Sequence, residues 1–196
     1  MSKLLIVTEG VTDQVFFKAL AKRMGLEQQI DVTERAGKSK ELLDAFLQER
    51  LLGYHSRGFD RILLVRDCDG LGEKAARDSM QSSIERVQKK HSHLTKIFGY
   101  MRIDFLVIPN NLEDLLLSIL KYPQINPCLD RFIECLKGCA ITGIPKKETK
   151  TRFLAYLSSM KEPTDRLNEP FVYEQFIHLD HEQLTEMKAK IGAMLI

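Results

Sequence analysis

The sequence predicts an α/β fold, with a parallel sheet flanked by helices and a helical C-terminal part. Short runs of Val, Ile and Leu bounded by Gly or Pro are typical of buried parallel strands. Longer segments with apolar residues at helical spacing lie between these runs. Strands that alternate with helices imply right-handed crossovers and therefore a parallel sheet. In addition, acidic residues directly follow two of the apolar runs.

The predicted elements follow one another along the N-terminal half of the chain. Strands are expected at residues 3–7, 29–33, 62–65 and 103–108, and helices at 12–24, 40–52 and 73–90. In the first helix, Phe16, Phe17, Leu20 and Met24 recur at helical spacing and predict a buried stripe. The helix at 73–90 is charged on most sides, so we expect it to face solvent.

From about residue 111 the pattern changes to short helical segments separated by prolines. Helices are expected at 115–120, 129–136, 147–160 and 181–195, without a further strand. We therefore predict an α/β core over residues 1–110 and a helical part over residues 111–196 that packs on it.

Composition restricts the function only weakly. The formal net charge is +2, and a local basic patch can bind a polyanion whatever the total charge. No apolar run approaches the roughly 20 residues needed to cross a bilayer. Because the chain also lacks a signal sequence and any Cys-x-x-Cys pair, we expect a cytoplasmic protein with reduced thiols.

Two acidic clusters follow predicted strands. Glu9 and Asp13 come after the first strand, and Asp67 and Asp69 come after the third. Function in parallel sheets gathers at the carboxyl ends of the strands, and carboxylate oxygens are the ligands that Mg²⁺ or Mn²⁺ prefers. The sequence therefore predicts that these four residues bind a divalent cation. For Asp13 a second interpretation is open, because a helix also favours an acid in its first turn.

The pairing of Glu9-Gly10 with Asp67-Cys68-Asp69-Gly70 resembles the Toprim domain, which topoisomerases, bacterial primases and the overcoming-lysogenization-defect (OLD) nucleases share. The resemblance covers about residues 3–110, and the spacing Glu9-x-x-x-Asp13 is most similar to the OLD branch and its small stand-alone relatives. In that branch the glutamate and the aspartates bind metal, and the domain cleaves phosphodiester bonds. The resemblance thus implies a Rossmann-like, metal-dependent nuclease. Type IA topoisomerases have an acid where this chain has Leu71, which argues against that activity.

Other residues are candidates for supporting roles. Glu9 is also a candidate catalytic base. Glu113 and Asp114 follow the fourth predicted strand. They either bind the metal directly or contact its ligands; alternatively, they are ordinary acids in the first turn of a helix. Lys38 is a candidate phosphate contact, although Val32 replaces the first glycine of a P-loop.

The densest basic stretch, at residues 146–152, offers two more candidate phosphate contacts. Lys147 and Lys150 either neutralise a nucleic-acid backbone or belong to a solvated helix face.

The function predicted from these residues is Mg²⁺-dependent cleavage of DNA or RNA. Two other interpretations are open. The first is a non-catalytic metal-binding module that regulates or binds a protein partner, for example in a defence system. The second is a haloacid-dehalogenase-like phosphatase with Asp67 as nucleophile, which would leave Glu9 unexplained. Whether the chain acts as a homodimer is also open.

Overall fold

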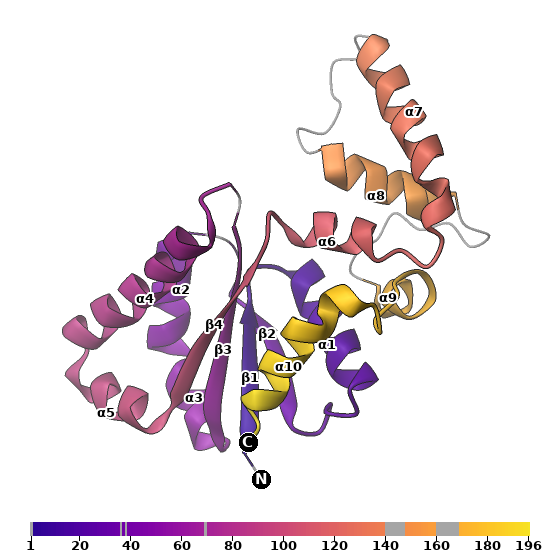
Figure 1. Ribbon diagram of the computed structural model, residues 1–196. Coiled ribbons are helices and arrows are strands. Elements are labelled where there is room, and N and C mark those ends of the chain that lie inside the picture. The colour runs from indigo at the N-terminus through magenta and orange to yellow at the C-terminus, as the bar shows by residue number, and fades with distance from the viewer. Residues whose placement is uncertain (1, 36, 38, 69, 140–147, 160–168) are drawn as a thin grey trace.

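The computed structural model describes residues 2–35, 37, 39–68, 70–139, 148–159 and 169–196. The described residues form one four-stranded parallel sheet in the order β2-β1-β3-β4. The strands are β1 (Lys3–Thr8), β2 (Ile30–Glu34), β3 (Phe59–Asp67) and β4 (Arg102–Ile108). The N-terminus lies at the bottom of β1 in Figure 1, so the carboxyl ends of the strands are at the top. The predicted α/β fold with a parallel sheet is confirmed.

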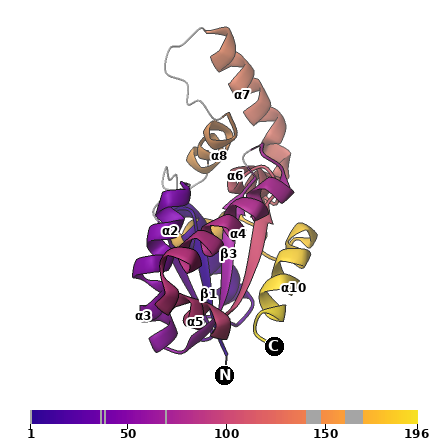
Figure 2. The ribbon, with the colours of Figure 1, turned by 90° about the vertical axis from the view of Figure 1, so that its left-hand side faces the viewer.

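Helices cover both faces of this sheet (Figures 1 and 2). One face is covered by α2 (Lys40–Glu49), α3 (Leu51–Ser56), α4 (Glu73–Lys90) and α5 (Ser92–Tyr100). The other is covered by α1 (Val11–Arg23), α6 (Leu112–Ser118), α9 (Pro170–Phe176) and α10 (Thr185–Ala193). A short 3₁₀ turn, η2 (Glu182–Leu184), precedes α10, and another, η1 (Pro123–Ile125), precedes α7 (Asn126–Gly138). Beyond α6, α7 and α8 (Glu148–Ser158) lie farthest from the sheet (Figure 1).

The strands divide the core into two layers because successive side chains of a strand point to opposite faces. Leu4, Ile6 and Val65 belong to the cluster on the α1 face, whereas Leu5 and Leu64 belong to the cluster on the α4 face. All of these side chains are buried, as expected for a sheet covered on both sides.

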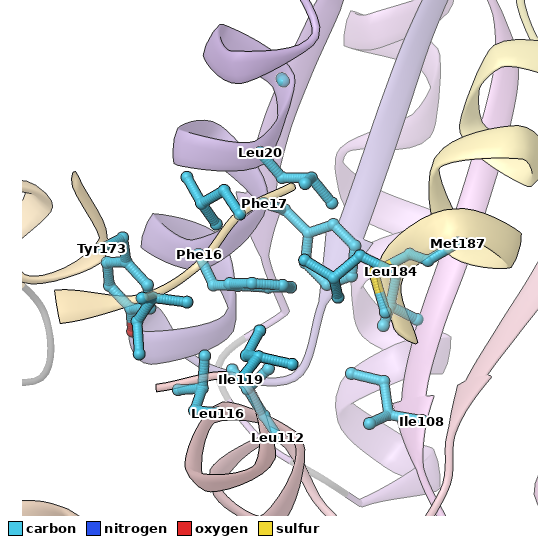
Figure 3. Close-up of a cluster of buried hydrophobic side chains, with 14 of the residues drawn as sticks. Phe16, Phe17, Leu20, Ile108, Leu112, Leu116, Ile119, Tyr173, Leu184 and Met187 are labelled. Carbon is cyan, nitrogen blue, oxygen red and sulfur yellow. The ribbon is translucent and has the colours of Figure 1, made fainter. Parts of the chain in front are cut away.

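The cluster on the α1 face also contains side chains from far along the chain. Figure 3 shows Phe16, Phe17 and Leu20 of α1 close to Leu116 of α6 and Leu184 of η2. The predicted boundary between residues 110 and 111 falls between β4 and α6 and stays a prediction. Within the described ranges, none of the helices combines the length and the apolar character needed to span a membrane.

Candidate metal centre

The loop after β1 presents Glu9 and Asp13 at the carboxyl edge of the sheet. Glu9 follows the last residue of β1 and is buried. The Gly10 N–H donates a hydrogen bond to Asp13 Oδ2 over 3.0 Å, which fixes the carboxylate against the start of α1. Asp13 is therefore a first-turn acid of α1, and its role as a metal ligand stays a prediction.

The loop after β2 holds the loop after β1 in place. The Arg35 N–H donates to the Thr8 carbonyl over 3.0 Å, and the Gly37 N–H donates to the Glu9 carbonyl over 2.8 Å. Gly37 has a φ of 138°, and a Cβ there would lie 2.7 Å from Leu42 Cδ1. This positive φ favours glycine, and a side chain at this position would also displace Leu42 of α2.

Asp67 is the last residue of β3 and is 7% exposed. The next residue, Cys68, donates its N–H to the Ile108 carbonyl of β4 over 3.0 Å, so the strand stays paired up to this point. Gly70 then takes a φ of 78°, in the left-handed region that favours glycine. Asp69 lies outside the described residues, so its role as a ligand stays a prediction.

The pKa of Asp13 shows that carboxylates from four elements converge. It is raised from 3.8 to about 7, first by burial and then by the charges of Asp67 and Glu9. The charge of Glu113 raises it further, and the hydrogen bond from Gly10 opposes the rise. We call these four carboxylates (Glu9, Asp13, Asp67 and Glu113) the acidic centre. Buried like charges favour either a proton or a cation among them.

Tyr173 of α9 adjoins the acidic centre from the side of the C-terminal helices. Its buried hydroxyl donates to the Thr12 carbonyl in the first turn of α1 over 3.2 Å. Burial raises the pKa of the Tyr173 phenol, and the charges of Asp13 and Glu113 raise it further. The phenol is therefore a neutral group beside two of the carboxylates.

Glu9 is bound by arginine. Arg35 Nη2 lies 2.6 Å from Glu9 Oε1, and these side chains are only 2% and 5% exposed. Arg66 Nε lies 3.7 Å from the same oxygen, and Arg66 Nη1 donates to Ser79 Oγ of α4 over 2.6 Å. We call Arg35 and Arg66 the arginine pair. It fixes the orientation of the Glu9 carboxylate.

The strand alternation separates the two parts of this site. Asp67 lies two residues beyond Val65 and therefore points to the α1 face, where Asp13 begins its helix. Arg66 points to the α4 face, as its bond to Ser79 requires. The carboxylates of the acidic centre thus lie next to a cationic group across the carboxyl end of β3.

The acids at the start of α6 differ in their surroundings. Asn111 Oδ1 accepts a hydrogen bond from the Asp114 N–H over 2.9 Å, and Asn111 Nδ2 donates to Asp114 Oδ2 over 2.8 Å. Asp114 Oδ1 accepts a bond from Thr149 Oγ1 of α8 over 2.8 Å. Both oxygens of Asp114 therefore accept hydrogen bonds that hold the start of α6 and connect it to α8. The charge of Glu113, in contrast, raises the pKa of Asp13.

The structure describes one of the three predicted phosphate contacts. Lys150 is exposed on α8, and Lys38 and Lys147 lie outside the described residues. Sequence reasoning missed Arg35, Arg66 and Tyr173. Only Arg66 had a signal, as a charged residue inside an apolar run directly before Asp67.

The fit to a divalent cation is partial. In the part of the chain that the structure describes, no three His, Cys, Asp or Glu side chains are already arranged to hold a metal ion. The donor type is nevertheless suitable, since carboxylate oxygens are the usual ligands of Mg²⁺ and Mn²⁺. Asp13, Asp67 and Glu113 are the described residues that would hold such an ion, together with Asp69 as predicted.

Comparison with known proteins gives a family without an assigned function. No curated protein matches the chain. Among solved structures, the chain is similar to the C-terminal region of the OLD protein from Xanthomonas campestris pv. campestris, with 15% identity and a TM-score of 0.39. That alignment covers 98% of this chain and 81% of the other. Residues 2–191 match the family model described as protein of unknown function (DUF3226), and the chain therefore belongs to the DUF3226 family.

Proposed function

We propose that the protein is a Toprim-like enzyme that uses Mg²⁺ or Mn²⁺ to hydrolyse phosphodiester bonds in a nucleic acid. The observation that carries this proposal is the raised pKa of Asp13, because it reports three other carboxylates around one partly buried acid. Clusters of perturbed acids at the carboxyl edge of a sheet are typical of functional sites. The Glu-Gly and Asp-x-Asp sequences that motivated the Toprim resemblance contribute two of these four carboxylates, Glu9 and Asp67.

The charges explain why a cation suits this position. Burial and the charge of Asp67 raise the pKa of Asp13 to about 7, so protonation of Asp13 relieves part of the repulsion between these two carboxylates. If a divalent cation were bound, Asp13 and Asp67 would hold it in place of the proton, with both carboxylates ionised. When bound, it neutralises the charge that develops on the phosphate oxygens.

In this proposal the residues of the chain have separate tasks. Asp13, Asp67 and Glu113 hold the cation, and Asp69 is the remaining predicted ligand. Glu9 accepts a proton from the attacking water, and Arg35 keeps its carboxylate oriented over a contact of 2.6 Å. Burial of this pair excludes water from the rest of the Glu9 side chain.

The variant Asp67→Asn tests the proposal. It removes a ligand charge with little change in volume, so we expect Mn²⁺ affinity to fall about tenfold or more, as measured by the electron paramagnetic resonance of free Mn²⁺. Cleavage of labelled DNA and RNA with Mg²⁺ or Mn²⁺ should be lost. The matched control is Asp44→Asn, since Asp44 is also buried but pairs with Arg86 between α2 and α4.

Two outcomes would contradict the proposal. If the wild type binds Mn²⁺ through Asp67 but cleaves neither DNA nor RNA, the protein is a non-catalytic metal-binding module. If Mn²⁺ binds equally well to both variants and to the wild type, the acidic centre is not a metal centre.

A further inference from the structure

Two arginines meet a single carboxylate oxygen beside the acidic centre. Arg35 Nη2 and Arg66 Nε lie 2.6 Å and 3.7 Å from Glu9 Oε1. The first distance is a charge-assisted hydrogen bond, and the second is too long to be one. Arg66 is therefore drawn toward Glu9 by charge while its Nε donates no hydrogen bond to that oxygen.

Among the described residues, Glu9 is the carboxylate that both members of the arginine pair approach. Arg35 and Arg66 both approach Glu9 Oε1, so the two guanidinium groups lie on either side of one carboxylate oxygen. Two guanidinium groups thus repel one another at this position. In addition, Arg35 Nε is buried and has no hydrogen-bond partner among the described residues. Both observations favour a second anion close to the arginine pair.

Arg66 is the member of the pair that an anion from solution can reach. Its side chain is 13% exposed, compared with 2% for Arg35. Ser79 Oγ accepts a hydrogen bond from Arg66 Nη1 and so fixes the plane of the guanidinium. A fixed guanidinium presents parallel N–H groups, a geometry that matches two oxygens of a phosphate.

The position of Arg66 at the end of β3 brings a positive charge to the edge of the sheet that carries the acidic centre. A substrate phosphate approaching the acidic centre meets several carboxylates, and like charges repel it. Arg66 precedes Asp67 at the end of β3, and its guanidinium supplies the opposite charge at the same edge of the sheet. Lysine residues predicted from the sequence to do this lie elsewhere or outside the described residues.

We propose that Arg66 binds a phosphate group and that Arg35, behind it, positions Glu9 at the edge of that phosphate site. The ligand class is a phosphate oxyanion. That this phosphate belongs to a phosphodiester substrate rests on the proposed function, whereas phosphate binding itself does not. Glu9 Oε1 is the anion that the arginine pair binds when phosphate is absent.

The test measures binding of inorganic phosphate to the full chain in the presence of EDTA, by ³¹P NMR line broadening at constant ionic strength. We expect Arg66→Gln to weaken phosphate binding about tenfold or more, since charge-assisted hydrogen bonds to an anion are lost. The matched control is Arg86→Gln. Arg86 also lies between a serine and a carboxylate on the α4 face, 3.4 Å from Ser83 Oγ and 3.3 Å from Asp44 Oδ2.

A second variant separates loss of binding from loss of structure. Arg66→Lys keeps the charge but lacks the paired donors, so we expect an intermediate affinity with unchanged circular dichroism. The proposal is overturned if Arg66→Gln or Arg66→Lys binds phosphate as tightly as the wild type. It is also overturned if Arg86→Gln loses as much affinity as Arg66→Gln.

The result is independent of the metal experiment. Phosphate binding that requires Arg66, in a protein whose acidic centre binds no Mn²⁺, would support this inference and contradict the proposed function. Mn²⁺-dependent cleavage that persists unchanged in Arg66→Gln would support the proposed function and contradict this inference.

Discussion

At the scale of single residues, two acids four positions apart have opposite environments. Glu9 lies against the guanidinium of Arg35, whereas Asp13 lies among carboxylates that raise its pKa to about 7. Pairs of acids whose surroundings differ in this way are how enzymes assign separate roles to chemically similar groups. This contrast supports a carboxylate of fixed orientation at Glu9 and an exchangeable proton or cation at Asp13.

The raised pKa of Asp13 predicts a pH-dependent stability of the metal-free protein. Below pH 3.8 the carboxyl is protonated in both native and unfolded chains, and between 3.8 and about 7 only the native state retains the proton. The free energy of unfolding therefore falls by about 1.4 kcal/mol per pH unit across this window and then levels off. Asp13→Asn removes this loss, so the variant should be more stable than the wild type at pH 8.

Urea unfolding in EDTA between pH 4 and pH 8 measures the effect. The stability difference between Asp13→Asn and the wild type should grow as the pH rises to about 7 and remain constant above it. Asp78→Asn is the control, because Asp78 is exposed on α4 and outside the acidic centre. A difference that is the same at pH 5 and pH 8 would show that Asp13 is not surrounded by ionised carboxylates.

The placement of these residues could be predicted from the sequence only in part. Glu9 and Asp67 directly follow apolar runs, so the ends of the strands locate them. Arg35 and Tyr173 follow no such rule. Arg35 contacts Glu9 across 26 positions, and the Tyr173 hydroxyl bonds to Thr12 across 161 positions. Contacts of this kind depend on how the elements pack, which hydrophobic periodicity does not encode.

At the scale of elements, the short helix α9 links the C-terminal part to the acidic centre. Tyr173 bonds to the carbonyl of Thr12, and its ring lies 5.9 Å from that of Phe16 in the same helix α1. The first turn of α1 also carries Asp13. The packing of α9 therefore helps to fix one carboxylate of the acidic centre.

Tyr173→Phe should show this link. The variant loses one hydrogen bond and keeps the ring, so we expect the free energy of unfolding to fall by about 1 kcal/mol. Mn²⁺ affinity should also fall severalfold, because the first turn of α1 is held less firmly. The control is Tyr156→Phe, which removes a comparable buried bond, 3.4 Å from the Phe176 carbonyl and away from the acidic centre. Equal Mn²⁺ affinities in the two variants would contradict a positioning role for Tyr173.

The limits of element prediction have identifiable causes. The predicted helix at 40–52 is two helices, α2 and α3, which meet at Arg50 and continue to Ser56. Gly53 favours an end of the predicted helix at residue 52, because glycine is a common stop signal of a helix. Pro170 at the start of α9 was an available signal, since proline suits the first turn of a helix. A helix of seven residues is too short for its periodicity to stand out.

At the scale of the whole molecule, the C-terminal part completes the core of the sheet. The cluster on the α1 face unites β1 and α1 with α6, α9 and α10. Polar contacts bring the end of the chain back to the strands, since Arg61 Nη1 donates to the Met194 carbonyl over 2.7 Å. Arg102 Nη1 likewise donates to the Ala193 carbonyl over 3.2 Å. Without these helices, one face of the sheet would expose apolar side chains.

We therefore expect that a chain of residues 1–110 does not fold stably on its own. Removing the rest uncovers Phe16, Phe17 and Leu20, which are buried in the complete chain (Figure 3). Burying one such side chain contributes roughly 1.5–3 kcal/mol to the free energy of folding. A typical domain is stable by only about 5–15 kcal/mol, so the loss of this burial at these three residues and at the apolar side chains around them removes a comparable free energy. The truncated chain should bind a hydrophobic dye and show no cooperative urea transition by circular dichroism.

Adding residues 111–196 as a separate chain provides the control. If the shared cluster holds the two parts together, the second chain should restore a cooperative transition and abolish dye binding. It should also restore Mn²⁺ affinity, because Glu113 and Tyr173 belong to the second chain and act on Asp13 of the first. A cooperative transition of residues 1–110 alone, with the Mn²⁺ affinity of the full chain, would instead show that the acidic centre needs neither residue and that the α/β core is an independent domain.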